Sequence, residues 1–388
     1  MASIRMKANR NAAQSAAVAI TLALIVGRHC DAFSLFGAKS QAKSPAETTQ
    51  GSTGARELSP EDVRAVEKHM KLGDAYFERK DYTNALIEYQ YVIKLDPRNY
   101  KAHFMLGKVL VAMVDYQEAL KEFQIVAELR PRSSDSHFML AEVQRLQGHY
   151  KEAIQQYRQS LKLDSRNALA HAYLAECYRM REGYRPAIAH LKKAIAIDPK
   201  LVVPHMILGQ CYVSDRQPNR GLEQLRKAIE LAPDDAVTHT RYAQALGKLG
   251  KWNDALPQFV RAVDLDPRYP DAHVGLSWAL AHTGRLDEAL KEARQAVALA
   301  PNSPDAQANL AWIYQQKGDH QAAVTHYKLA LKIDPRNPQL HRALGLALSD
   351  NGDLNGAIAE LLVTSRMLPN DYEVRLGLQS LMQRRPQN

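Results

Sequence analysis

A helix-ending landmark recurs at one fixed interval along most of this 388-residue chain. Nine landmarks follow one another every 34 residues, and all but one are proline: Pro97, Pro131, Ser165, Pro199, Pro233, Pro267, Pro301, Pro335 and Pro369. An unbroken period of this length is typical of stacked structural repeats that share a core, and not of separate globular domains. The landmarks define nine units, with the bounds 66–99, 100–133, 134–167, 168–201, 202–235, 236–269, 270–303, 304–337 and 338–371.

Small and large residues recur at matching places when each unit is numbered from 1 to 34. Position 20 carries only small residues: Ala85, Ala119, Ala153, Ala187, Gly221, Ala255, Ala289, Ala323 and Ala357. Position 8 is also small, as in Gly73 and Gly107, whereas positions 7 and 24 are mostly large. Two helices in each unit can therefore approach closely at the small residues while the large ones fill the space beside them.

Each unit has a short polar turn between its two expected helices. Five turns carry glycine at the same place, which suits a left-handed C-terminal cap: Gly148, Gly250, Gly284, Gly318 and Gly352. Beyond the last unit, residues 372–385 repeat the spacing of a first helix through Leu378 and Met382. We therefore expect an all-α, right-handed α-solenoid of nine helix-turn-helix repeats, closed by a C-terminal cap helix.

These landmarks resemble the tetratricopeptide repeat (TPR), whose pattern has Leu-Gly or Leu-Ala at positions 7 and 8, Ala at 20, an aromatic residue at 24 and Pro at 32. The resemblance covers about four fifths of the chain, so residues 60–388 are expected to form a TPR domain. It implies a protein-binding fold without naming the partner.

Histidine fills position 4 in eight of the nine units: His69, His103, His137, His171, His205, His239, His273 and His341, with Gln307 in the eighth. Metal ligands must lie about 2 Å from one ion, whereas successive units are separated by a helix-packing distance. We expect these rings to pack between units with local hydrogen bonds. Their charging near pH 6.5 would then soften the array in acid.

The resemblance also implies that positions 2, 5, 9, 12 and 13 of the first helices line a concave groove for partner segments. Trp278 and Trp312 share position 9 in adjacent units, so they should stand side by side, either as binding anchors or as cover for the contact between first helices. The predicted protein-binding residues are Met70, Phe77, Phe104, Phe138, Met206, Trp278 and Trp312.

Several other functions lack their sequence signals. Turns of about four residues without insertions offer no shaped loops for catalysis, and no nucleophile–base arrangement, phosphate loop or metal cluster is evident. We therefore predict no enzyme activity, no cofactor and no metal. The net charge of +9 is distributed among many acids, which argues against nucleic acid as a partner. The Lys and Asn pattern of chaperone-binding TPR clamps and the Asn ladder of sugar-transferring relatives are missing too.

The N-terminus differs in composition from the repeats. Residues 1–32 contain Arg5, Lys7 and Arg10 before the apolar run 16–27, which indicates a signal peptide or an N-terminal membrane anchor. The run is shorter than a bilayer span, which favours a cleaved signal, although a mitochondrial presequence and a cytosolic protein with a chance apolar start remain alternatives. Residues 33–59 are small and polar, as expected for a flexible linker.

The sequence as a whole predicts an exported, periplasmic or membrane-associated scaffold. Such a protein would bind a partner segment in its groove as part of an envelope or secretion assembly. The alternative is a structural TPR protein that assembles with copies of itself into a homo-oligomer or coat.

Overall fold

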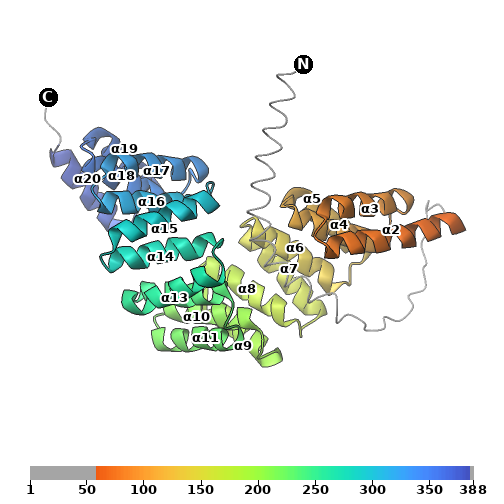
Figure 1. Ribbon diagram of the computed structural model, residues 1–388. Coiled ribbons are helices and arrows are strands. Elements are labelled where there is room, and N and C mark those ends of the chain that lie inside the picture. The colour runs from red at the N-terminus through yellow and green to blue at the C-terminus, as the bar shows by residue number, and fades with distance from the viewer. Residues whose placement is uncertain (1–57, 385–388) are drawn as a thin grey trace, which may run out of the picture. The chain divides into compact units, whose positions relative to one another are not determined.

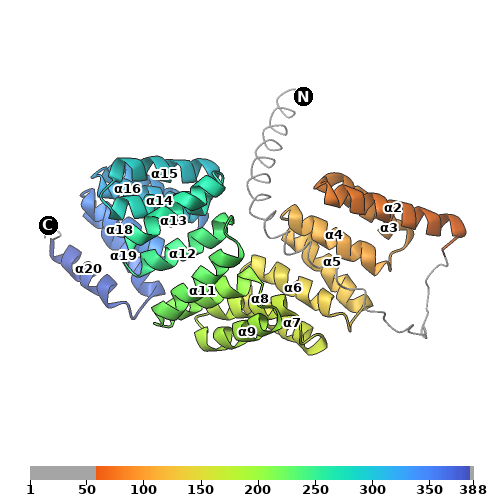
Figure 2. The ribbon, with the colours of Figure 1, turned by 60° about the horizontal axis from the view of Figure 1, so that its bottom comes forward.

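The computed structural model describes residues 58–384, which form nineteen α-helices and no β-strand (Figures 1 and 2). The chain divides between Pro199 and Lys200 into two compact units, called here unit 1 and unit 2. The predicted signal or anchor (1–32) lies outside the described residues, as does most of the predicted linker (33–59).

Unit 1 is a stack of four helix pairs in which each helix packs on the one before it. It begins at Ser59, whose side chain and backbone form a reciprocal capping box with Asp62. Its helices are α2 (Pro60–Glu78), α3 (Tyr82–Leu95), α4 (Tyr100–Ala112), α5 (Tyr116–Leu129), α6 (Ser134–Leu146), α7 (Tyr150–Leu163), α8 (Ala168–Met180) and α9 (Tyr184–Ile197).

Unit 2 continues the pattern with five helix pairs and a final single helix. Its helices are α10 (Val202–Ser214), α11 (Pro218–Leu231), α12 (Ala236–Lys248), α13 (Trp252–Leu265), α14 (Pro270–His282), α15 (Leu286–Leu299), α16 (Pro304–Gln316), α17 (His320–Ile333), α18 (Pro338–Asp350), α19 (Leu354–Met367) and α20 (Tyr372–Arg384). The last helix buries Leu378 and Leu381 against the preceding pair, whereas Met382 is 52% exposed. The predicted all-α solenoid of helix pairs with a cap helix is thereby confirmed.

The two helices of a pair lie close because a small residue faces a large one. A Cβ added to Gly73 would lie 2.6 Å from the ring of Tyr89, and one added to Gly107 would lie 2.7 Å from the ring of Phe123. Both rings are fully buried. The alternation of small and large residues in the sequence therefore marks the core of each pair, as expected.

The turn inside every pair contains one residue in the left-handed region at position 15. The five predicted glycines have φ values from 72° to 85°. The other four repeats place a non-glycine residue there, namely Lys80, Val114, Glu182 and Arg216, with φ between 58° and 64°. The turn geometry is therefore fixed by the repeat even where glycine is absent, and Val114 bears the largest steric cost because it is β-branched.

Replacing Val114 with glycine should relieve this strain. We expect Val114→Gly to raise the free energy of unfolding by about 1 kcal/mol, since the left-handed conformation costs a β-branched residue more than the added chain entropy of glycine. Urea denaturation followed by circular dichroism measures the change. Gly148→Val, at φ 77°, is the matched reverse variant and should destabilise the protein; an unchanged or lower stability of Val114→Gly would contradict the assignment of strain.

The position 4 histidines fasten each repeat at two points. In His103, Nδ1 donates to Oε2 of Glu122 at 2.6 Å, and Nε2 donates to the carbonyl of Pro97 at 3.1 Å. The first contact joins the helices of one pair, and the second joins that pair to the end of the preceding repeat. We call this arrangement the histidine clamp; its position 4 and 23 pairs are His69–Glu88, His103–Glu122, His137–Gln156, His171–His190, His205–Gln224, His239–Gln258, His273–Glu292, Gln307–His326 and His341–Glu360.

The partner at position 23 sets how each clamp responds to pH. Burial alone would lower the pKa of His103, but the hydrogen bonds to Glu122 and to the Pro97 carbonyl more than offset this effect and raise it. His190 has the opposite environment: burial, the facing His171, and the nearby Lys193 and Arg158 lower its pKa to about 4. The expected softening in acid therefore belongs to the His171–His190 pair, whereas the His103 clamp is strengthened in acid.

The sign of each contribution follows from these shifts. The stability that His103 supplies is fully present below about pH 6.5 and is lost as pH rises through its raised folded pKa. The stability associated with neutral His190 is present above about pH 6.5 and is lost as pH falls toward about 4.

His190→Gln should reduce the sensitivity of unit 1 to acid. Glutamine occupies position 23 in three other repeats, so the clamp to His171 can persist without a second imidazole. We expect the loss of unfolding free energy between pH 7 and pH 5 to shrink by roughly 1 kcal/mol, as measured by urea denaturation at the two pH values. His149→Gln, at an exposed helix cap, is the control; identical pH profiles of His190→Gln and the parent would refute the assignment.

Candidate functional site

The first helices of unit 2 carry a stacked pair of tryptophans. Trp278 on α14 and Trp312 on α16 have ring centroids 4.1 Å apart and planes inclined by 26°. The two helices contact each other directly, and both side chains are half-buried. The predicted side-by-side placement is confirmed, and each indole keeps part of its surface open to solvent.

Two further rings enlarge this surface. The ring of His282, at the end of α14, stacks on Trp252 at 4.2 Å and 7°. It also lies 5.8 Å from Trp278 and 5.5 Å from Trp312. Burial lowers the pKa of His282, so the imidazole is uncharged at neutral pH. We call Trp252, Trp278, His282 and Trp312 the aromatic patch, which offers a partner ring faces and no net charge.

Sequence reasoning missed two of these four residues. His282 occupies position 13, one of the positions expected to face a partner, so it could have been found. Trp252 begins a second helix at position 17, where the first four repeats carry tyrosine, and its ring packs against Gly247. Nothing in the helical periodicity indicated that Trp252 would meet the end of α14.

The predicted residues of unit 1 are less uniform. Met70, Phe77 and Phe104 are half-buried, and the ammonium of Lys108 lies 5.0 Å above the centre of the Phe77 ring. Phe104 packs edge-on against the buried Phe123, with centroids 5.7 Å apart. These rings are therefore already used in packing or in a cation–π contact within the unit.

Phe138 is a correction to the predicted set. It is only 4% exposed, because its ring lies between Tyr157 of its own repeat and Tyr173 of the next, with centroids 5.8 and 6.2 Å apart. At this position the side chain closes the contact between two repeats, so it belongs to the core and cannot touch a partner.

Ion pairs take the place of aromatic rings on the first helices of unit 1. Arg145 binds Glu142 through two hydrogen bonds of 3.1 and 2.9 Å, and its guanidinium lies 4.8 Å from the centre of the Tyr173 ring. Burial alone would lower the pKa of Arg145, but the charge and hydrogen bonds of Glu142 more than offset it and raise the pKa. Glu176 and Arg179 repeat the arrangement one unit later. These charges satisfy one another and leave little for a partner.

Met206 lies apart from the other predicted residues in sequence. It is half-buried on α10, two first helices before α14 in unit 2. The structure thus brings Trp278 and Trp312 together, while the remaining predicted residues occupy separate surroundings.

The described residues show no chemistry beyond binding. Between residues 58 and 384, no three His, Cys, Asp or Glu side chains gather in a way that could hold a metal ion. Cys177 and Cys211 are free and buried, and burial raises the pKa of the Cys177 thiol to about 12, which leaves it unreactive. In the same part of the chain, no helix combines the length and apolar character needed to cross a bilayer.

Comparison with known proteins gives the same picture of the fold. A family profile described as tetratricopeptide repeat matches residues 104–168, 145–201 and 241–304, and a second, described as TPR repeat, matches 73–114 and 312–352. A profile for the anaphase-promoting complex, cyclosome, subunit 3 matches residues 180–262. No curated protein matches the chain.

Solved structures agree with the profiles. A tetratricopeptide repeat protein from Parabacteroides merdae ATCC 43184 is 14% identical, with a TM-score of 0.57 over 64% of this chain and 99% of its own. MamA is 21% identical over 44% of this chain and 94% of its own, with a TM-score of 0.40. The Pseudomonas aeruginosa pilF protein is 19% identical over 57% and 100%, with a TM-score of 0.46. On the repeat profiles and the paired helices that they match, the chain belongs to the tetratricopeptide repeat family.

Proposed function

We propose that this protein is a protein-interaction scaffold whose main anchor is the aromatic patch of unit 2. The observation that carries the proposal is the stacked, half-buried pair Trp278 and Trp312, joined by His282. A TPR array is suited to this role because its first helices present one side chain after another at the helix-packing spacing. A partner segment laid across α14 and α16 would meet both indoles.

The energetics of the surface favour the patch over unit 1. Truncating one tryptophan in an interface can cost 2 kcal/mol or more, whereas an exposed ion pair contributes about 0–1 kcal/mol. The charges of Glu142 and Arg145 are also paired with each other, so a partner would have to break that pair to use them. The indole faces carry no such cost.

Packing between first helices is the competing role of the two tryptophans. Trp312 lies against the apolar core on both sides of α16, so part of its ring stabilises the fold. The exposed remainder of each ring is the area we assign to the partner. The two roles are separated by measuring stability and binding on the same variants.

Trp278→Ala with Trp312→Ala should abolish capture of the partner. We expect binding of the native partner, identified by photo-cross-linking from position 315 in the source cell, to weaken at least about 30-fold, which corresponds to 2 kcal/mol or more. Val260→Ala with Leu329→Ala is the matched control, since it removes similarly exposed apolar side chains from second helices. Equal affinity of the folded tryptophan variant and the control would rule out the patch as anchor.

We propose further that the protein acts outside the cytoplasm or tethered to a membrane, within an envelope or secretion assembly. Residues 1–32 support this placement through their cationic start and the apolar run that follows. Mass spectrometry of the protein purified from its cell tests it: a shortened N-terminus, or an intact chain in the membrane fraction, is expected. An intact chain in the cytosol would contradict the placement.

Self-assembly stays a prediction beside this function. A molecular mass by light scattering that does not change with concentration would rule it out. We propose no catalytic role, because the family fold is typical of scaffolds and the patch offers no acid, base or nucleophile.

A further inference from the structure

A contact between neighbouring repeats occurs twice in this chain with the same three residues. In the first copy, the guanidinium of Arg158, at position 25 of its repeat, donates to the hydroxyl of Tyr178, at position 11 of the next, at 2.5 Å. The ring of Tyr178 stacks on His190, at position 23, with centroids 5.9 Å apart.

The second copy has the same order of residues in unit 2. Arg294 donates to the hydroxyl of Tyr314 from Nη2 at 3.0 Å and from Nε at 3.3 Å, and Tyr314 stacks on His326 at 5.5 Å. Arginine at position 25 is therefore matched by a tyrosine at position 11 and a histidine at position 23 of the following repeat.

Arg226 is the third arginine at position 25, and it lacks both partners. The following repeat has Leu246 in place of the tyrosine and Gln258 in place of the histidine. Gln258 is bonded to Nδ1 of His239 at 2.8 Å in the histidine clamp. Among the described residues, Arg226 makes no hydrogen bond, ion pair or ring contact and only helps to lower the pKa of Glu230, behind the Lys227 hydrogen bond and charge.

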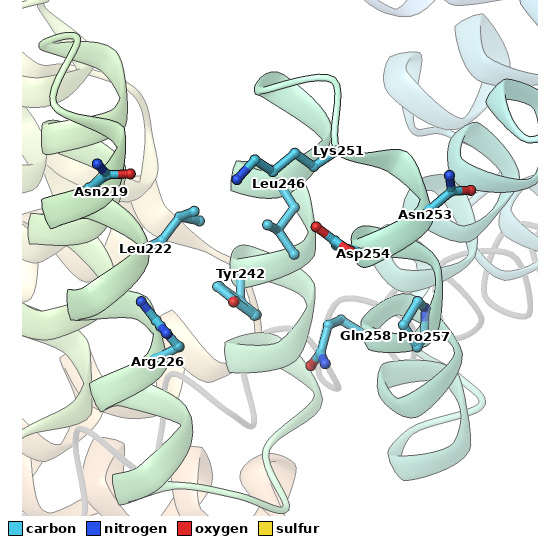
Figure 3. A pocket seen from close by; sticks show the side chains of 10 residues that line it. All are labelled: Asn219, Leu222, Arg226, Tyr242, Leu246, Lys251, Asn253, Asp254, Pro257 and Gln258. Atoms are coloured by element: carbon cyan, nitrogen blue, oxygen red, sulfur yellow. The ribbon is translucent and has the colours of Figure 1, made fainter.

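A pocket of about 500 Å³ occupies this place between α11, α12 and α13 (Figure 3). Arg226 and Leu222 line it from α11, Tyr242 and Leu246 form its floor on α12, and Pro257 with Gln258 closes the side toward α13 (Figure 3). Leucine and glutamine are smaller than the two rings that fill the equivalent space in the other copies. The pocket is thus the space of a missing tyrosine, bounded by the guanidinium that would bind its hydroxyl.

We propose that this pocket binds a phenol ring, supplied by a tyrosine side chain of a partner segment. The ring would lie on Leu222 and Leu246, which are 7% and 3% exposed, and its hydroxyl would accept from Arg226 as in the two complete copies. The amides of Asn219 and Asn253 at the rim suit the backbone on either side of such a tyrosine. The site shares no residue with the aromatic patch, so either can fail without the other.

Binding of small probes to the full chain tests the chemistry of the pocket. We expect p-cresol, the tyrosine side-chain analogue, to bind with a dissociation constant in the millimolar range, as is usual for a ligand of this size. Arg226→Ala should weaken p-cresol about tenfold and leave toluene unchanged, because a hydrogen bond to a charged donor is lost only for the phenol. Arg294→Ala, at the complete copy, is the matched control. Protein-observed NMR titration gives the constants and the location.

A second variant fills the pocket without removing the arginine. Leu246→Tyr with Gln258→His rebuilds the complete copy, and we expect it to abolish p-cresol binding while thermal unfolding shows a folded protein. N-acetyl-tyrosinamide should bind at least as tightly as p-cresol to the parent chain. The proposal is overturned if no probe binds, if toluene binds as well as p-cresol, if the filled variant still binds, or if p-cresol binds and N-acetyl-tyrosinamide does not.

Discussion

The histidine clamp is the interaction on which the order of the array depends. One imidazole joins the two helices of a repeat through Nδ1 and holds the end of the preceding repeat through Nε2, as His273 does with Glu292 and the Pro267 carbonyl. The carbonyl at position 32 follows the last turn of a helix and would otherwise be an unsatisfied acceptor next to the core. A single side chain thus fixes both the angle within a pair and the placement of the next pair.

Because the clamp and the small-to-large packing recur in nearly every repeat, they cannot distinguish one surface of the array from another. Differences in function must come from positions that leave the core pattern intact. Position 9 shows this plainly: it carries Asp74, Lys108, Glu142 and Glu176 in unit 1, but Trp278 and Trp312 in unit 2. The same backbone therefore presents self-satisfied charge in one unit and open ring faces in the other, and only the second leaves binding energy unspent.

The sequence predicted what depends on period and failed where contacts cross the turn. The helix pairs, the glycine turns and the neighbouring tryptophans follow from a 34-residue register and 3.6-residue helices. The clamp partner lies 19 residues from its histidine, so no helical periodicity indicates it. A signal was nevertheless present, since Gln307 and His326 exchange the two residue types and keep the bond. Phe138 was misplaced because helical phase alone does not tell which side chain a neighbouring repeat, here through Tyr173, will cover.

Repeats within one chain supply their own reference structures. An exposed arginine on a surface is ordinary, and so is a shallow pocket between helices. Arg226 becomes informative only because Arg158 and Arg294 stand at the same position and bind a tyrosine in the next repeat. Two substitutions in one following repeat, Leu246 and Gln258, account at once for the unpaired guanidinium and for the empty volume beside it. A defect in an otherwise exact internal pattern is stronger grounds for a binding site than the shape of the pocket alone, because the pattern states which chemical group is missing.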